Sequence, residues 1–291
     1  YLPRRLAWMS HDLQLYPQLS YGLECLLATP LELSKEMRKV VRHCLSPLGV
    51  NRNIKAEFAT MSHKYQGISL PNWTAEKLAK DVNVLFRHWG LDNAIGRLLR
   101  NSYELLQMET GLQGNVFSRS FASFGCLATH SWMKILWQYA RKLKVSILFV
   151  DRESVPLMRV GDVAWTDKLA AMGFKGNSLV RLNRVRKFKG VHSVSDTTAC
   201  DGRSILPHVL TDSPGNSSRE WSIEQPTKED FSLWNHAMSL AYDCDGKLRT
   251  ALGSFIASPH INNEWTLSPD GLILCEQRSP DEFAIFKRLP L

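Results

Sequence analysis

A helical period of apolar side chains, repeated along most of the chain, constrains the fold more than any other feature. Residues 30–45 show it most clearly, because Thr29, Pro30 and Glu32 supply an N-cap, a first-turn proline and a capping box. Apolar side chains then recur every three or four residues, and basic side chains fall on the opposite side. The pattern predicts an amphipathic helix, ended by Pro47, with one face in a core and the other uniformly positive.

Similar stripes, bounded by capping residues and glycines, predict further helices. We expect them after Thr74, Asp92 and Thr129, and over residues 162–172, 178–188 and 227–242. The β-branched apolar run 145–150 predicts a strand. Residues 265–267 and 272–275 flank a Pro269-Asp270-Gly271 turn and predict a β-hairpin, to which residues 283–286 add a third strand.

These elements predict an α+β fold that is predominantly α-helical, with a helical body followed by a smaller mixed region that ends in the β-hairpin. We divide the chain into a basic helical segment with an extended strap (1–72), a helical body with one strand and a basic helix (73–195), and an acidic mixed α/β region (196–291). The longest apolar runs are far shorter than the roughly 20 residues of a membrane helix, so we expect no membrane partner.

The six cysteines show no spacing typical of a metal site or a disulfide framework, because the closest pair is 19 residues apart. We therefore expect reduced thiols and an intracellular location, cytoplasmic or nuclear. The chain starts with Tyr1 and carries no signal-peptide pattern, and we take it to be part of a longer product.

Charge is distributed unevenly along the chain. Residues 196–291 contain 8 basic and 14 acidic side chains, a net of −6, whereas the whole chain has a net charge of +8. Residues 1–195 therefore carry +14, which favours a polyanionic partner, although a solvated basic face without a specific partner is the alternative. The positive charge is concentrated in two clusters: Lys35, Arg38, Lys39 and Arg42; and Lys175, Arg181, Arg184, Arg186, Lys187 and Lys189.

The sequence contains no motif that predicts an active site. Glycine-rich phosphate loops, nucleophile elbows and paired-histidine zinc motifs are absent from it. Asp243 and Asp245 resemble paired metal-binding aspartates, but they are not adjacent and they follow a predicted helix, so we expect a solvated turn there. Asp151 follows the predicted strand without a matching set of acidic residues. We therefore expect no cofactor in this chain.

Several ordered blocks nevertheless resemble the region that follows the palm in reverse transcriptases of non-LTR-type retroelement polyproteins. The matching blocks are Tyr16-Pro17-Gln18-Leu19-Ser20-Tyr21, residues 48–56, Tyr65-Gln66-Gly67-Ile68-Ser69-Leu70, residues 131–137, residues 182–186, Val194-Ser195-Asp196, Asp201-Gly202-Arg203, and the late Trp221, Trp234 and Trp265. The order of these blocks carries the resemblance, because each alone is weak. Lys55 stands in place of the family's proline, and Gln66 and Ser69 stand in place of two of its glycines.

The resemblance implies a non-catalytic part of an RNA-directed DNA polymerase, namely the thumb and connection that grip a template–primer duplex. The metal-binding aspartates and their Mg²⁺ would belong to an upstream palm of the same polyprotein, so no activity is expected from this chain alone. The basic face of the helix over 30–45, extended by Arg52 and Lys55, would contact the sugar–phosphate backbone of RNA or an RNA/DNA duplex. The second cluster would extend this track or hold a displaced single strand. The alternative is a stand-alone protein-interaction or scaffold module, from a domesticated or decayed element.

Overall fold

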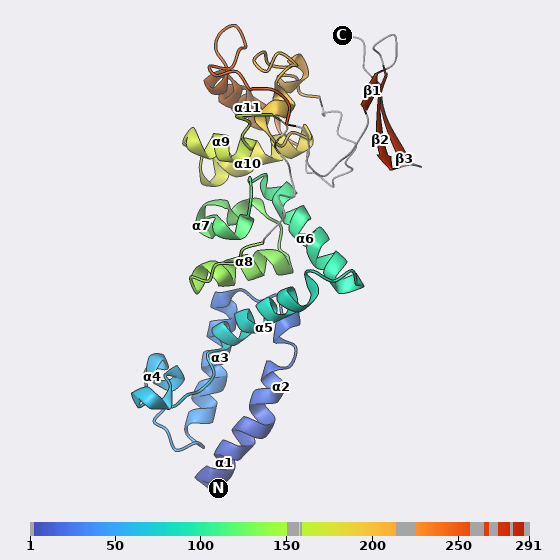
Figure 1. Cartoon of the computed structure of the whole chain (residues 1–291). Helices are drawn as coiled ribbons and strands as arrows, with labels where there is room; N and C mark the ends of the chain where they lie inside the picture. Colours follow the sequence, from blue (N-terminus) through green and yellow to red (C-terminus); the bar gives the residue numbers. More distant parts are fainter. Residues whose placement is uncertain are drawn as a thin grey trace.

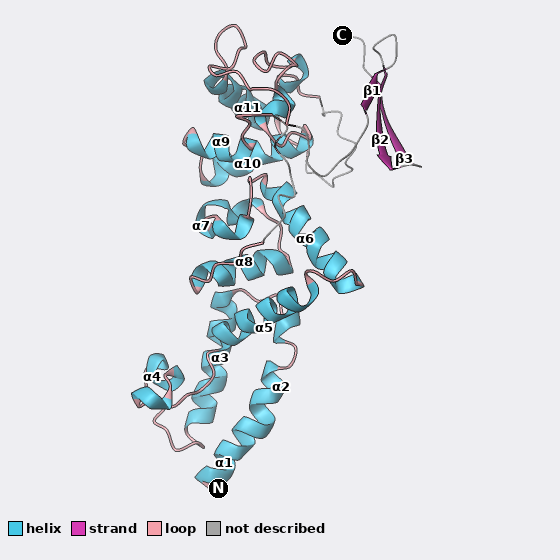
Figure 2. Ribbon diagram, in the orientation of Figure 1, coloured by secondary structure: helices cyan, strands magenta, loops and turns pink. Residues whose placement is uncertain are grey.

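The computed structural model describes residues 3–149, 157, 159–213, 225–256, 265–267, 273–279 and 282–287. Side chains are described up to residue 256, Ala56 excepted. Helices dominate this part of the chain and follow one another along a long axis, with α1 near one end and α11 near the other (Figures 1 and 2). The predominantly α-helical class is therefore confirmed.

The helices cover most of the predicted stretches. They are α1 (Arg4–Ser10), α2 (Tyr16–Ser20), α3 (Pro30–Leu45), α4 (Ala56–Thr60), α5 (Trp73–His88), α6 (Ala94–Thr110), α7 (Phe121–Phe124), α8 (Trp132–Lys142), α9 (Trp165–Ala171), α10 (Gly176–Phe188) and α11 (Lys228–Ala241). A π-helical turn, His11–Leu15, joins α1 to α2, and short 3-10 turns occur in several connections.

The start of α3 is as predicted. The backbone N–H of Glu32 donates to the Thr29 hydroxyl at 3.3 Å, and the N–H of Thr29 donates to the Glu32 carboxylate at 2.8 Å. Other helices start one or two residues away from the expected cap. In these helices a nearby polar side chain accepts the hydrogen bonds from the backbone N–H groups of the first turn instead. Asn72 caps α5, Asn93 caps α6 and Ser131 caps α8.

The strand predicted over residues 145–150 is wrong for the described residues 145–149, which form an irregular segment. Ile147 and Phe149 pack against the first group of buried apolar side chains, whereas Val145 and Leu148 are exposed. The Phe149 ring lies 4.2 Å from that of Trp89 and 4.6 Å from that of Tyr103, measured between centroids. Val150 lies outside the described residues.

Three short strands follow late in the chain: β1 (Trp265–Leu267), β2 (Ile273–Ser279) and β3 (Glu282–Lys287). They pair antiparallel in the order β1-β2-β3, with Thr266 opposite Cys275 and Cys275 opposite Ile285. The turn expected at residues 269–271 lies outside the described part.

Three hydrophobic clusters hold the helices together. The first joins α3, α5, α6 and α8 through buried residues such as Leu33, Leu78, Leu106 and Trp137. The second joins α9, α10 and α11 around Trp165, Leu182 and Trp234. A small third cluster contains Leu45, Leu48, Ala59 and Leu70. The packing therefore groups the chain differently from the predicted segments: the first cluster crosses the 72/73 boundary and the second crosses 195/196.

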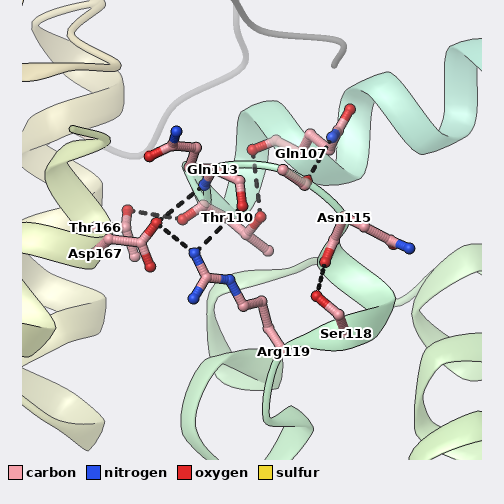
Figure 3. A network of polar contacts seen from close by, with 9 residues as sticks. Gln107, Thr110, Gln113, Asn115, Ser118, Arg119, Thr166 and Asp167 are labelled. Atoms are coloured by element: carbon pink, nitrogen blue, oxygen red, sulfur yellow. Dashed lines mark hydrogen bonds and ion pairs between the residues drawn. The ribbon is translucent and has the colours of Figure 1, made fainter. Parts of the chain in front are cut away.

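A polar network connects the first cluster to the second (Figure 3). The loop after α6 reaches α9, where Asp167 accepts from the Arg119 guanidinium at 2.9 Å and from the backbone N–H of Gln113 at 3.1 Å. The Thr166 hydroxyl donates to the carbonyl of Thr110 at 2.8 Å. These bonds fix the end of α6 against the start of α9.

The strap after α4 contains two non-glycine residues in the left-handed region, Gln66 with φ 62° and Ser69 with φ 58°. An L-residue is strained in this conformation by about 1–2 kcal/mol, whereas glycine is not. The Ser69 hydroxyl compensates in part by accepting from the N–H of His63 at 2.8 Å.

Replacing Gln66 by glycine is therefore expected to stabilise the protein by about 0.5–1 kcal/mol, since relief of strain exceeds the added entropy of the unfolded chain. Urea denaturation followed by circular dichroism measures the change. Gln66→Ala is the control and should give no gain, because alanine keeps the strain. If alanine stabilised the protein as much as glycine, relief of backbone strain could not be the cause.

Candidate nucleic-acid interface

An open cleft of about 1010 Å³ lies among α3, the loop leading into α4, the start of α5 and the end of α8. Five basic side chains line it: Arg38, Arg42, Arg52, Lys55 and Lys142. All five are exposed, and no ion pair is recorded for them within the described residues. Glu57 is the acidic residue that shares the lining. The cleft therefore presents an excess of unneutralised positive charge.

The cleft forms because the chain reverses direction directly after α3. The N–H of Val50 donates to the carbonyl of Leu45 at 2.8 Å, and Gly49 takes a positive φ of 74°. Leu48 and Ala59 then pack into the third hydrophobic cluster. These contacts hold residues 52–55 alongside α3, so the loop cations face the same space as those of the helix.

The structure divides the first predicted basic cluster. Arg38 and Arg42 are one turn apart on α3 and both line the cleft, together with Arg52 and Lys55 as expected. Lys35 and Lys39 are exposed on α3 but do not line it. Lys39 instead donates to Glu36 at 2.9 Å.

Lys142 was missed by sequence reasoning. It lies in the last turn of α8, about a hundred residues after the other cleft cations, and reaches the cleft because α8 packs near α3 in the first hydrophobic cluster. No local pattern indicates this proximity, because it depends on how two distant helices pack.

The second predicted cluster does not form one free basic surface. Arg186 is buried and donates to the carbonyls of Met108, Glu109 and Val191 at 2.7–3.2 Å. Burial lowers its pKa to about 10. Lys189 is also buried and donates to the carbonyls of His208 and Thr211. Arg186 lies on α10 as predicted and Lys189 directly follows that helix, but both side chains satisfy backbone carbonyls.

Two further cations of this cluster are neutralised by α11. Arg181 donates to Asp230 at 2.6 Å and to Glu229 at 3.4 Å, and Arg184 donates to Asp230 at 2.9 Å. Lys187 is half-buried, which leaves Lys175, at the start of α10, as an exposed member. The acidic part of the chain thus packs on the second basic cluster, which removes most of it as a candidate phosphate-binding surface.

Asp230 stabilises this contact only while it is ionised. Burial works against ionisation, but hydrogen bonds from Arg181, from the N–H of Thr227 and from Arg184 outweigh it and lower the pKa of Asp230 to about 2. Because the folded pKa lies below the ordinary value of 3.8, the contribution is present above about pH 4 and is lost as the pH falls towards 2.

Asp230→Asn is accordingly expected to lower the free energy of unfolding by about 2 kcal/mol at pH 7. The difference from the unmodified protein should shrink as the pH falls from 4 towards 2. Urea denaturation over this pH range tests both statements. The exposed Asp245→Asn is the matched control and should change stability by less than about 0.5 kcal/mol. A penalty for Asp230→Asn that is unchanged at low pH would contradict the ionic explanation.

Of the remaining candidates, Asp243 and Asp245 lie within the described residues, where they form a turn. Asp243 accepts from the N–H groups of Asp245 and Lys247 and closes the turn after α11. Asp151 lies outside the described residues. Within the described part of the chain, no cluster of His, Cys, Asp and Glu side chains has the arrangement of a metal site.

Nothing among the known family models, the curated proteins or the solved structures matches this chain. Among the helices that the structure describes, none is both long and apolar enough to span a bilayer.

Proposed function

We propose that this chain is the non-catalytic, template–primer-gripping part of a retroelement reverse transcriptase. The cleft cations would contact the phosphate backbone of RNA or an RNA/DNA duplex, and the catalytic aspartates with their Mg²⁺ would belong to an upstream palm. This role would be carried out inside the cell, in the cytoplasm or nucleus. The acidic region, including its β-hairpin, would dock on the body through α11.

The observation that carries this proposal is the collection of five exposed cations from three separate segments in one cleft. Clustered cations release counterions when they neutralise phosphates, so they bind nucleic acid without reading its bases. Five exposed cations meet in this cleft, although other exposed cations, such as Lys35, Lys39 and Lys175, lie outside it. This favours a polyanionic ligand over a charge pattern that serves solubility alone.

The backbone of the strap gives independent support for the resemblance. Gln66 and Ser69, which replace family glycines, both have positive φ. Lys55, which replaces the family's proline, caps α4 with φ −63°, a value that proline also adopts. The conformation at all three positions is therefore one that the family residues would favour.

Paired substitutions on α3 test the proposal. Arg38→Gln with Arg42→Gln should weaken binding of an RNA/DNA hybrid and reduce the slope of log affinity against log salt by about two units. Lys35→Gln with Lys39→Gln removes the same charge from the same helix, outside the cleft, and should have a smaller effect. Fluorescence anisotropy at several salt concentrations measures both. Equal effects of the two pairs would show that the cleft has no special role.

The alternative, a protein-interaction or scaffold module, is favoured by one observation. Leu91, Ile95, Leu98 and Leu105 form an exposed apolar stripe along α6 and its approach, with Leu98 66% exposed. Stripes of this kind often mark protein-binding surfaces. Folded protein that binds no nucleic acid at physiological salt would favour this alternative.

A further inference from the structure

The cleft has an apolar floor in addition to its basic rim. Met37 and Val41 from α3, Ile54 from the loop, Pro71 and Leu143 all line it and are half-buried. Met37 and Leu143 belong to the margin of the first hydrophobic cluster, while Val41 and Ile54 belong to the margin of the third. The cleft thus lies where two cores meet, and apolar surface from both remains accessible.

Backbone contacts with a duplex do not account for this floor. A duplex presents phosphates and sugars outward and keeps its bases stacked inside, so it needs only a charged surface. Apolar surface that faces phosphates or water is not removed from a polar environment, so binding a duplex would give it no hydrophobic stabilisation. An open recess of about 1010 Å³ that combines accessible apolar side chains with charged ones suits a compact ligand that has both an apolar and a charged part.

An unpaired nucleotide has the required chemistry. Its base offers two apolar faces, and its phosphates offer the negative charge that the rim complements. Arg38 and Arg42 from α3, Arg52 and Lys55 from the loop, and Lys142 from the end of α8 line the same cleft as Val41 and Ile54. A base resting on Val41 and Ile54 would therefore share the cleft with cations from three segments that could hold its flanking phosphates.

We propose that the cleft accommodates an unpaired nucleotide of a single-stranded segment, with the base on the apolar floor and the flanking phosphates on the basic rim. This inference rests on the proposed nucleic-acid-binding function and makes it more specific. The ligand class is single-stranded RNA or DNA, or the overhang of a duplex, and not a blunt duplex alone.

Binding of three labelled probes to the whole chain tests the inference. The probes are a single-stranded oligonucleotide in RNA and DNA forms, an abasic oligonucleotide of equal length and charge, and a blunt RNA/DNA hybrid. The base-containing strand should bind about tenfold more tightly than the abasic one, in line with the usual contribution of one base contact. Val41→Thr should reduce this ratio severalfold.

Val40→Thr is the matched control. Val40 is the adjacent valine, is also half-buried, and does not line the cleft, so the base-to-abasic ratio should stay at the unmodified value. Urea denaturation of both variants establishes that they are folded. Equal affinity for base-containing and abasic strands, with binding still dependent on Arg42, would overturn the inference and leave the proposed function standing. Failure of the folded chain to bind any probe at low salt would overturn both.

Discussion

Replacing Asp81 by asparagine should lower the free energy of unfolding by about 3–5 kcal/mol, one of the two largest effects expected for a single substitution in this chain. Lys77 and Asp81 are one turn apart on α5, and both side chains are fully buried in the first hydrophobic cluster. The Lys77 ammonium donates to both carboxylate oxygens at 2.7 Å. Without the carboxylate, a positive charge remains in the core with no counterion.

A double substitution separates this explanation from a simple packing defect. Lys77→Met with Asp81→Leu removes both charges, and it should recover most of the lost stability, because an apolar pair needs no counterion. Glu36→Gln breaks the exposed pair with Lys39 and should leave the stability nearly unchanged. Urea denaturation of the three variants gives the comparison. A double variant as unstable as Asp81→Asn would contradict the ionic explanation.

Arg186→Met should destabilise the protein by about 2–4 kcal/mol. Its guanidinium is buried and donates to the carbonyls of Met108, Glu109 and Val191, and to the Asn183 side chain at 2.8 Å. Methionine preserves much of the side-chain volume but leaves those carbonyls without this donor. The loss falls where the end of α6 meets α10, so the first and second hydrophobic clusters should also unfold less cooperatively.

Thermal and urea unfolding, each followed by tryptophan fluorescence and circular dichroism, measures this prediction. The matched control is Arg87→Met on the exposed face of α5, which should change stability by less than about 0.5 kcal/mol. Equal stability of the two variants would show that the carbonyls at the end of α6 do not depend on Arg186.

Local signals predicted the helices well because those signals act within a few residues. The Thr29 and Glu32 capping box, the apolar stripe of α3 and the glycine after α6 each need only neighbouring side chains. The strand predicted over 145–150 failed for the opposite reason. Apolar β-branched residues favour a strand only where another strand is available to pair with them, and in this segment Phe149 packs on the rings of Trp89 and Tyr103 instead.

At the candidate site too, local features were predicted from the sequence and long-range contacts were not. The sequence correctly placed Arg38 and Arg42 on one helix, and it expected Arg52 and Lys55 to extend that surface. It could not show that Arg186 is buried among carbonyls, or that Asp230 neutralises two arginines of α10, because these contacts join residues up to 78 positions apart. A cluster of cations in sequence therefore did not imply a cluster of free charge in space.

The most direct test of the central claim is equilibrium binding of an RNA/DNA hybrid by the whole unmodified chain over a series of salt concentrations. If four or five cleft cations neutralise phosphates, log affinity should fall linearly with log salt concentration, with a slope between about −3.5 and −4.5. A folded chain that does not bind the hybrid at low salt, or binds it with an affinity independent of salt, would contradict the proposed grip on a template–primer duplex.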